Sequence, residues 1–427
     1  MNALIARRVA VIGGTRIPFC RSNTAYVGLG NYELSLQAVA GVVERFGLSG
    51  VELGEVALGA VIKHSSDWNL GREVALSSGL SALTPGITMQ RACGTSLDTT
   101  LHIANKIALG QIDAGIAGGS DTTSDVPIAY GAKLRRRVLD MSRGKSLGQR
   151  LAAWRGFRFG ELKPNLPGVS EPRTGKSMGE HCEQMARQWQ IAREDQDRLA
   201  LASHQKAAAA WRAGFFDDLV IPLRGVDRDN NLRADTTLEK LATLKPAFDK
   251  HSGHGTLTAG NSTPLTDGAA AVLLATDDWA AARGLRAQAW ITEARVAAVD
   301  FVGGEGLLMA PTVAVAEMLA RAGMTLQDFD FYEIHEAFAA QVLCTLRAWE
   351  SPDYCRERLG LAAPLGAIDP AKLNVNGSSL AAGHPFAATG ARIVATLAKL
   401  LEQKGTGRGL ISICTAGGMG VVAILER

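Results

Sequence analysis

One order of segments occurs twice in this chain, and no other feature constrains its fold as strongly. Cys93 is followed by a helical pattern over residues 96–109, then by a strand-like run and a pair of glycines. His384 is likewise followed by a helical pattern, by a strand-like run over 409–413 and by the pair Gly417-Gly418. A unit that occurs twice predicts two similarly folded halves that face each other.

Strand-like and helical segments alternate along both halves. The expected strands cover residues 9–12, 56–61, 114–117, 329–334, 409–413 and 419–425, and the expected helices cover 32–46, 96–109, 179–189, 194–213 and 336–346. Such alternation is typical of a largely parallel sheet covered by helices. With 427 residues the chain is too long for one ordinary core, so two or three domains are expected.

Two histidines of the second half are expected at the starts of helices. His335 follows the strand-like run 329–334, and His384 precedes a helical pattern that Gly405 would cap. Open α/β sheets usually bind ligands at the carboxyl ends of their strands, so each half would bring its reactive residue there.

The composition disfavours several classes of protein. A net charge of +3 gives no reason to expect a nucleic-acid partner. The six cysteines lack paired spacing, so we expect no disulfide framework, and a reducing, cytoplasmic compartment fits best. Residues 1–8 lack the apolar run of a secretory signal, and no stretch is long and apolar enough to span a membrane.

Two local motifs are better explained without a bound ligand. Gly13-Gly14 could begin a dinucleotide-binding loop, but the third glycine is missing and Pro18 stands where a helix should start. His251 and His254 could begin a metal site, but no third ligand lies near them in the sequence, so no metal is expected.

Residues 133–176 form a strongly basic segment. Twelve lysines and arginines there face three acidic residues, and Trp154, Phe157 and Phe159 lie among them. Charge runs are usually solvated faces, which would make the segment an exposed insertion. The functional alternative is a cationic surface that receives the phosphates of a nucleotide-like cofactor or docks on an anionic membrane or partner.

Cys93 has the surroundings of a nucleophile. An isolated cysteine is more often a small buried hydrophobe. This one stands just before a predicted helix, whose unpaired N–H groups and dipole would stabilise a thiolate. Gly94, Thr95 and Ser96 leave room for an acyl group.

Three further residues could assist that thiol. His384, between glycine and proline, could take the thiol proton and help to hold an oxyanion. Cys414 precedes two glycines whose region could line an oxyanion hole, although a buried structural thiol is the simpler interpretation. His335 could be a core or capping residue, or could orient a water against a substrate carbonyl. A nucleophilic thiol, an imidazole base and a second thiol suit carbon–carbon bond chemistry beside a thioester.

These motifs closely resemble those of the thiolase superfamily, nearly from end to end. The matching segments are residues 89–96, 260–270, 335–339, 383–390 and 414–418. Other thiolases usually carry asparagine where this chain has His335. Histidine there, with Pro-Phe-Ala-Ala-Thr-Gly after His384, resembles the β subunit of the fatty-acid β-oxidation trifunctional complex and its bacterial anaerobic-type relatives.

The resemblance implies a thiolase fold, in which two βαβαβαββ halves stack as a five-layer α-β-α-β-α core with an inserted loop domain. The expected N-terminal half comprises residues 1–128 and 245–275, the loop domain 129–244, and the C-terminal half 276–427.

The resemblance also implies a mechanism. Cys93 would attack the 3-keto carbon of a 3-ketoacyl-CoA while His384 takes its proton. Cys414 would protonate the departing acetyl-CoA enolate and then deprotonate incoming coenzyme A. One oxyanion hole would combine His384 with a water held by His335, and the other would use the backbone N–H groups of Cys93 and Ala416.

Coenzyme A would be a co-substrate, without a permanently bound cofactor. The residues expected to contact it or the substrate are Ser177, Met178, Thr263, Ala337 and Phe338. The implied assembly is a homodimer or a dimer of dimers. A hydratase/dehydrogenase α subunit and a peripheral membrane contact through residues 133–176 are further candidate partners.

Two alternative functions stay open. A biosynthetic acetyl-CoA acetyltransferase would run the same residues in reverse, and a non-catalytic scaffold subunit would keep only the binding surfaces. A ketoacyl synthase of the same fold would use a cysteine with two histidines, so Cys414 argues against it.

Overall fold

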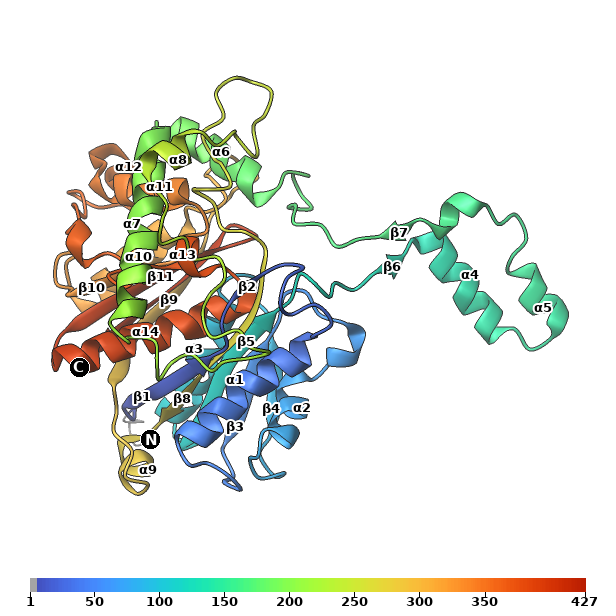
Figure 1. Cartoon of the computed structure of the whole chain (residues 1–427), viewed down its shortest axis with the longest axis horizontal. Coiled ribbons are helices and arrows are strands. Elements are labelled where there is room, and N and C mark those ends of the chain that lie inside the picture. Colours follow the sequence, from blue (N-terminus) through green and yellow to red (C-terminus); the bar gives the residue numbers. More distant parts are fainter. Residues whose placement is uncertain (1–5) are drawn as a thin grey trace.

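The computed structural model describes residues 6–427, in which two similar α/β halves share one ten-stranded sheet (Figure 1). The N-terminal half has the strand order β4-β3-β5-β8-β1, with β1 (Val9–Arg16), β3 (Glu55–Gly59), β4 (Gly86–Met89), β5 (Ala114–Asp121) and β8 (Thr266–Ala275). The C-terminal half has the order β10-β11-β12-β9, with β9 (Ala289–Ala298), β10 (Phe331–Ile334), β11 (Arg408–Thr415) and β12 (Met419–Glu426).

The two halves repeat the same strand directions. In each half the strands next to one another near the outer edge are parallel, as in β3–β5 and β10–β11. The last strand of each half, β8 or β12, runs antiparallel to both of its neighbours. Leu373 pairs in parallel with Tyr332, at the place that β4 occupies in the first half. The halves join where β1 pairs with β9.

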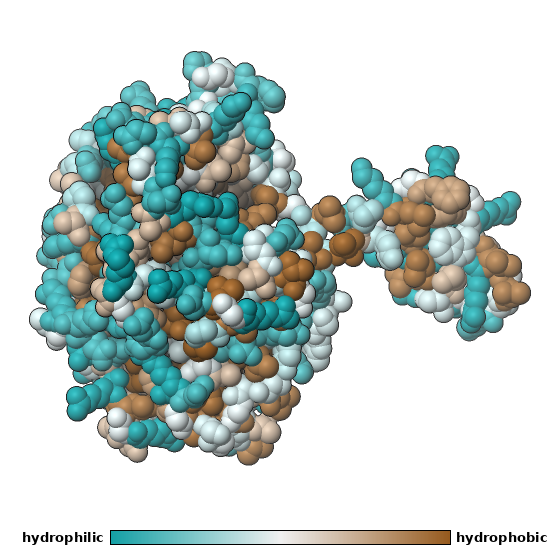
Figure 2. All heavy atoms as spheres, viewed as in Figure 1, coloured by the Kyte–Doolittle hydropathy of each residue, from teal (hydrophilic) through white to brown (hydrophobic). Residues whose placement is uncertain are grey.

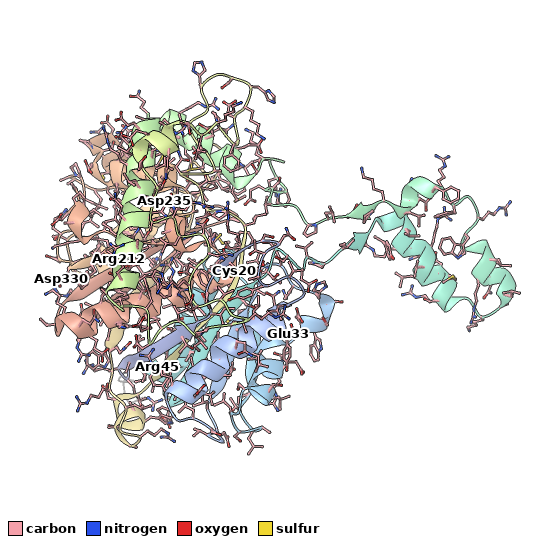
Figure 3. All side chains as sticks on the ribbon, viewed as in Figure 1. Cys20, Glu33, Arg45, Arg212, Asp235 and Asp330 are labelled. Carbon is pink, nitrogen blue, oxygen red and sulfur yellow. The ribbon has the colours of Figure 1, made fainter. Side chains whose placement is uncertain are left out.

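Helices cover both faces of each half. The central helices α3 (Thr95–Ala108) and α14 (Thr389–Lys404) pack on each other between the two halves. The outer helices are α1 (Asn31–Arg45) and α2 (Leu70–Ser77) on the first half, and α10 (Ala310–Ala322) and α11 (Ala339–Glu350) on the second. Glu33 and Arg45 mark the first and last turns of α1, where their charges oppose the helix dipole (Figure 3). The predicted α/β fold class is confirmed.

A long excursion separates β5 from β8. It begins with an arm, residues 129–165, that projects far from the body (Figure 1). The arm consists of β6 (Ala129–Tyr130), α4 (Ala132–Arg143), α5 (Leu147–Ala152), the 3₁₀ turn η2 (Phe159–Leu162) and β7 (Pro164–Asn165). The chain then returns through α6 (Met178–Gln188), α7 (Arg193–Arg212) and α8 (Leu238–Ala242), of which α6 and α7 pack on α11.

The remaining elements are short. They are β2 (Cys20–Arg21), η1 (Ser65–Asp67), α9 (Asp277–Ala281), α12 (Pro352–Glu357), η3 (Pro370–Lys372), α13 (Ser379–Ala382) and η4 (Phe386–Ala388). Within residues 6–427 no helix has both the length and the apolar character needed to cross a membrane. Residues 1–8, which lack the apolar run of a secretory signal, lie mostly outside the described residues, which begin at residue 6.

Most predicted elements are confirmed to within a few residues, but both predicted histidine positions are wrong. His335 does not open a helix, because α11 begins only at Ala339. The intervening backbone is extended, since Phe338 pairs with Ser262 and the Ala339 N–H donates to Asn261. His384 precedes α14 by five residues, and its backbone pairs with Leu265.

The glycine pairs are less alike than the sequence suggests. Gly13-Gly14 lies inside β1, paired with β8, so the chain forms no phosphate loop there. Gly118-Gly119 also lies inside a strand, β5, whereas Gly417-Gly418 forms the turn between β11 and β12. Gly405 does end α14 in the left-handed conformation, as predicted.

Candidate active site

The active-site geometry begins where α3 and α14 cross close to their N-termini. The Ala391 N–H donates to Ser96 Oγ at 2.8 Å. A Cβ atom on Gly390 would lie only 2.2 Å from the Leu97 backbone nitrogen, so this crossing requires glycine. Because both helix starts meet here, the segments before them, with Cys93 and His384, are held at one place between the halves.

Cys93 lines a cavity of about 740 Å³. Burial raises the pKa of the thiol to about 12, and the nearby backbone N–H of Ala416 opposes this shift by favouring the thiolate. The preceding residue, Ala92, has a left-handed backbone with φ of 42°, which is strained for a residue with a Cβ and typical of functional turns. Arg91 pairs with Asp98 at 3.0 Å, so its charge is already neutralised on α3. The resting thiol is therefore protonated and needs a base.

Two imidazoles supply candidate bases. The ring centroids of His335 and His384 lie 4.1 Å apart, and both rings are buried. Burial, with a smaller contribution from the Arg392 charge, lowers the pKa of His384 to about 3. Burial also holds the pKa of His335 well below its usual value, assisted by His384 and Arg392. Both rings are neutral at pH 7, so each has one nitrogen with a free lone pair.

The imidazoles are close to the Cys93 cavity. Phe386 meets the His384 ring edge-on, with ring centroids 5.3 Å apart, and lines the same cavity as Cys93. The backbone N–H of His384 donates to Thr266 Oγ1 at 2.8 Å, which fixes the loop before α14 against β8.

Cys414 lies in β11 and is almost fully buried. Burial raises the pKa of its thiol well above the usual value, and the nearby charge of Cys93 raises it further. Two residues later Ala416 directs its N–H toward Cys93, and the Gly417 N–H donates to Glu171 Oε1 at 2.6 Å. The turn after β11 thus connects Cys414, the Ala416 N–H, which could donate to an oxyanion, and Glu171 at the base of the arm.

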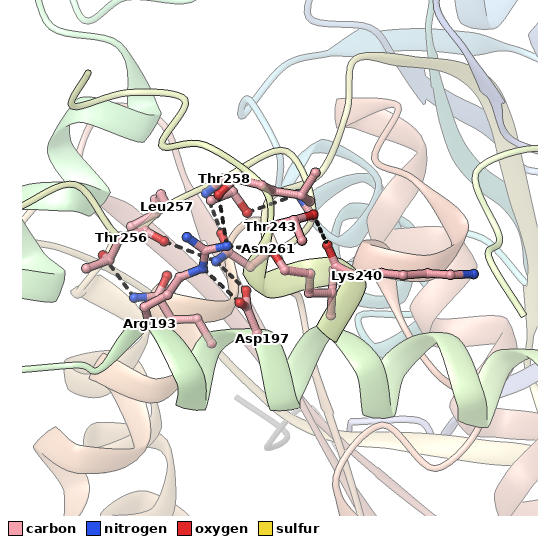
Figure 4. A network of polar contacts seen from close by, with 12 residues as sticks. Arg193, Asp197, Lys240, Thr243, Thr256, Leu257, Thr258 and Asn261 are labelled. Atoms are coloured by element: carbon pink, nitrogen blue, oxygen red, sulfur yellow. Dashed lines mark hydrogen bonds and ion pairs between the residues drawn. The ribbon is translucent and has the colours of Figure 1, made fainter. Parts of the chain in front are cut away.

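The loop of residues 256–263 is fixed by a buried polar network (Figure 4). Asn261 Nδ2 donates to Asp197 on α7 at 3.0 Å, and the Thr258 N–H donates to Asn261 Oδ1 at 2.7 Å. Arg193 Nε donates to the same Asp197 at 2.8 Å. This network holds the motif that carries Thr263 against the segment after His335.

The five residues predicted to contact coenzyme A or substrate are not all in the Cys93 cavity. Met178 lines it. Ser177 caps α6, where its hydroxyl accepts from the Glu180 N–H. The Thr263 hydroxyl donates to the Ala337 carbonyl at 3.0 Å, and Phe338 is buried against Phe248, with ring centroids 5.7 Å apart. The last four therefore have structural contacts, and their ligand roles stay predictions.

Sequence reasoning missed four polar residues around the reactive groups. Ser379 and Thr389 contact His335 and His384, Arg392 contacts Ser379, and Glu171 holds Gly417. Thr389 stands in the motif Pro-Phe-Ala-Ala-Thr-Gly after His384, but nothing in the sequence marks Ser379 or Arg392, because serine and arginine are common in helices. Glu171 is one of only three acidic residues in the basic segment, which was its one available signal.

The remaining thiols and histidines give no second centre. All six cysteines are free thiols, and Cys20 is buried at the start of β2 (Figure 3). His251 and His254 are exposed in a loop, and residues 6–427 contain no group of three metal-ligating side chains. The arrangement around Cys93 can perform nucleophilic acyl chemistry, since it combines a thiol, neutral imidazoles, a backbone N–H near the sulfur and a second thiol.

Known proteins are similar to this chain in sequence and fold along nearly its whole length. Residues 9–278 match the family described as "Thiolase, N-terminal domain", and residues 285–427 match "Thiolase, C-terminal domain". The chain is 41% identical over 425 residues to proteins named "3-ketoacyl-CoA thiolase" from Yersinia pestis and Yersinia pseudotuberculosis, covering 98% of this chain and 97% of each relative.

Two solved structures are similar over 99% of this chain and 100% of their own. The Bacillus anthracis acetyl-CoA acetyltransferase has a TM-score of 0.82 with 31% identity. The human mitochondrial 3-ketoacyl-CoA thiolase has a TM-score of 0.80 with 28% identity.

Proposed function

This chain belongs to the thiolase family, and we propose that it cleaves 3-ketoacyl-CoA with coenzyme A through an acyl intermediate on Cys93. It is an acyltransferase of the 3-ketoacyl-CoA thiolase type, in keeping with its 41% identity to proteins of that name. The observation that carries the residue assignment is that Cys93 and Ala416 line one cavity with Phe386, which packs on the His384 ring of a pair of neutral imidazoles.

The roles follow from protonation states. Cys93 is protonated at rest, so His384, whose lone pair is free at pH 7, takes its proton as the sulfur attacks the 3-keto carbon. The tetrahedral oxyanion collapses, the C2–C3 bond breaks, and Cys414 donates a proton to the departing acetyl-CoA enolate. Cys414 then takes the proton of incoming coenzyme A, whose sulfur attacks the acyl-Cys93 thioester. The Cys93 thiolate leaves and recovers its proton from His384. The backbone N–H groups of Ala416 and Cys93 stabilise the oxyanion that forms when coenzyme A attacks the thioester. His335 acts at the earlier oxyanion, which forms when Cys93 attacks the 3-keto carbon.

We propose that the acyl substrates are medium or long. The cavity beside Cys93 has about 740 Å³, and Val61, Ile62, Val169 and Met178 give it apolar walls. A four-carbon acetoacetyl group would fill a small part of such a space, whereas a long chain gains about 0.8 kcal/mol for each CH₂ that it buries.

Thiolysis of two substrates side by side tests this proposal. The kcat/KM for 3-ketohexadecanoyl-CoA should exceed that for acetoacetyl-CoA by at least about tenfold, which corresponds to about 1.4 kcal/mol of extra binding in the transition state. A preference for acetoacetyl-CoA would instead identify an acetyl-CoA acetyltransferase. Absence of thiolysis with both substrates would favour the non-catalytic scaffold.

We also propose that the arm docks on an anionic membrane surface. The arm exposes Leu147, Leu151 and Phe159, which are 74%, 64% and 85% accessible, and hydrophobic side chains show on its surface (Figure 2). Ten of the twelve basic residues of the segment belong to the same arm. Exposed apolar groups with flanking cations suit the interface of a bilayer with negative headgroups.

Vesicle co-sedimentation tests the arm. The wild-type chain should bind vesicles that contain phosphatidylglycerol better than neutral vesicles, and L147S/L151S/F159S should lose that binding. Leu83→Ser, which removes a 73% exposed leucine from the body, is the matched control. Equal binding by wild type and triple variant would refute the docking proposal.

The assembly and the compartment belong to the same proposal. The resemblance of residues 335–339 and 383–390 to the trifunctional β subunit supports a homodimer or dimer of dimers and a hydratase/dehydrogenase α subunit. The two reactive thiols suit a reducing compartment such as the cytoplasm. We keep the predicted division into residues 1–128 with 245–275, 129–244 and 276–427, of which residues 1–5 are not described.

A further inference from the structure

His335 and His384 stand in nearly equivalent surroundings. His335 Nδ1 lies 2.8 Å from Ser379 Oγ, and His384 Nδ1 lies 2.6 Å from Thr389 Oγ1. Both Nε2 atoms are buried without a hydrogen-bond partner among the described residues. A base needs an unprotonated Nε2, whereas a hydrogen-bond donor to an oxyanion or water needs a protonated one. Something must therefore distinguish the two rings.

The distinction begins with Arg392. Its Nη2 donates to Ser379 Oγ at 2.8 Å, and a guanidinium can only donate. The hydroxyl of Ser379 has His335 Nδ1 as its one remaining partner. If His335 Nδ1 also carried a proton, the hydroxyl hydrogen would be buried without an acceptor, at a cost of about 1–3 kcal/mol. The Ser379 hydroxyl therefore donates to His335 Nδ1, and the proton of the neutral ring resides on Nε2.

Thr389 receives no such bond. No guanidinium donates to its oxygen, so the Thr389 hydroxyl is not polarised toward donation as that of Ser379 is, and its oxygen can accept from His384 Nδ1–H, although the Thr389 hydrogen then has no acceptor among the described residues. That arrangement leaves the Nε2 lone pair of His384 free. When Nε2 takes a proton, Nδ1 keeps its bond to Thr389, so the ring can become charged without losing its partner.

Arg392 is itself firmly placed. It is 4% exposed, and its Nη1 lies 3.9 Å from Glu333 Oε2. It also donates to Ser378 Oγ at 3.3 Å, which lies beside Ser379 at the start of α13. The guanidinium is thus held near both rings, and it bonds to the hydroxyl that contacts His335 but not to the hydroxyl that contacts His384.

We propose that Ser379 and Arg392 are positioning residues that lock His335 in the Nε2–H tautomer. His335 then acts only as a hydrogen-bond donor toward the cavity, and His384 alone acts as the base. This inference rests on the proposed function of the two histidines, and it assigns a reason for their different roles to residues that touch neither substrate nor reacting atoms.

The tautomer can be measured directly. In the full-length chain labelled with ¹⁵N-histidine, long-range ¹H–¹⁵N correlations distinguish Nδ1–H from Nε2–H in a neutral ring. His335→Gln identifies the signal of His335 among those of the eight histidines. We expect Nε2–H in the wild-type chain, and Nδ1–H there would overturn the proposal. This result does not require activity, so it separates failure of the inference from failure of the thiolase assignment.

Two serine variants link the tautomer to the rate. Ser379→Ala should let His335 populate Nδ1–H and lower kcat for thiolysis by about tenfold, a part of the 10²–10³ that loss of one oxyanion donor costs, with KM nearly unchanged. Ser378→Ala removes a hydroxyl from the same arginine and should keep the Nε2–H tautomer. Retention of both the tautomer and full kcat in Ser379→Ala would refute the lock. If Ser379→Ala does not fold, the wild-type tautomer decides.

Discussion

Glu171 connects the base of the arm to the turn that presents the Ala416 N–H to Cys93. Its Oε1 accepts from the Gly417 N–H at 2.6 Å, and the side chain is buried, with the residue 6% exposed. Gly417 has a left-handed backbone, with φ of 78°, which favours glycine. Because glycine has no side chain, the bond from Glu171 fixes this turn. We predict that Glu171→Ala lowers kcat without a comparable change in KM.

The magnitude follows from the bond that is lost. A hydrogen bond to a charged group contributes about 1.5–3 kcal/mol, and 1.4 kcal/mol is a factor of ten. The cavity can admit water to the freed Gly417 N–H, so we expect the lower end, a fall in kcat of about tenfold. Glu171→Gln keeps an acceptor oxygen and should lose less than about fivefold, since neutral hydrogen bonds contribute about 0.5–1.5 kcal/mol.

Steady-state thiolysis of a 3-ketoacyl-CoA measures both parameters. Asp328→Ala is the control, because Asp328 also accepts a backbone N–H, that of Thr325 at 2.7 Å, but lies in an exposed turn. Its kcat should match wild type. The reasoning is refuted if Glu171→Ala keeps wild-type kcat, or if Glu171→Gln is impaired as severely as Glu171→Ala.

Three further predictions concern the nucleophile, the helix crossing and the pH dependence of stability. Cys93→Ser should lower kcat by at least about 10³ and abolish the acyl adduct seen by intact-protein mass spectrometry, and an adduct at wild-type yield would exclude Cys93 as nucleophile. Gly390→Ala should reduce the free energy of unfolding by about 3 kcal/mol, because its Cβ would meet the Leu97 backbone, whereas Gly131→Ala, in open space, should change it by less than about 0.5 kcal/mol. Burial lowers the pKa of His204 to about 4, so the unfolded chain binds more protons below about pH 6.5, and stability should fall as pH drops. Urea unfolding measures the free energy of unfolding at pH 7 and pH 5. Between these two pH values His204→Gln should lose about 2 kcal/mol less of it than wild type. Equal losses in the two proteins would contradict the lowered pKa of His204.

The strands and long helices were predictable because each is long and follows one periodicity. The helix expected over residues 96–109 is α3 (Thr95–Ala108), with Leu97 and Leu101 on its buried face. The helix starts near the histidines were not predictable from periodicity. Residues 335–338 pair with the distant loop around Ser262, and that long-range pairing overrides the local helical pattern.

The reactive residues were predictable for a different reason, since each stands in a motif of glycine, proline or small residues that a core would not require. Cys93 and His384 are of this kind. The groups that fix them were not predictable, because their roles depend on contacts across the fold. Ser379 is 44 positions from His335, and Glu171 is 246 positions from Gly417. Only the folded chain shows that a hydroxyl or carboxylate has one particular partner.

The repeated halves explain why different chemistry meets at one point. The segments before α3 and α14 occupy equivalent places, one with a thiol and the other with an imidazole. Similarly, β5 ends in Asp121, whose carboxylate accepts from the Ala387 N–H in the His384 loop, while β11 carries Cys414 near its end. A symmetric pair of halves would place identical groups face to face. Divergence at these matched positions instead juxtaposes a thiol with a base and a second thiol, and the glycine at the helix crossing keeps them close.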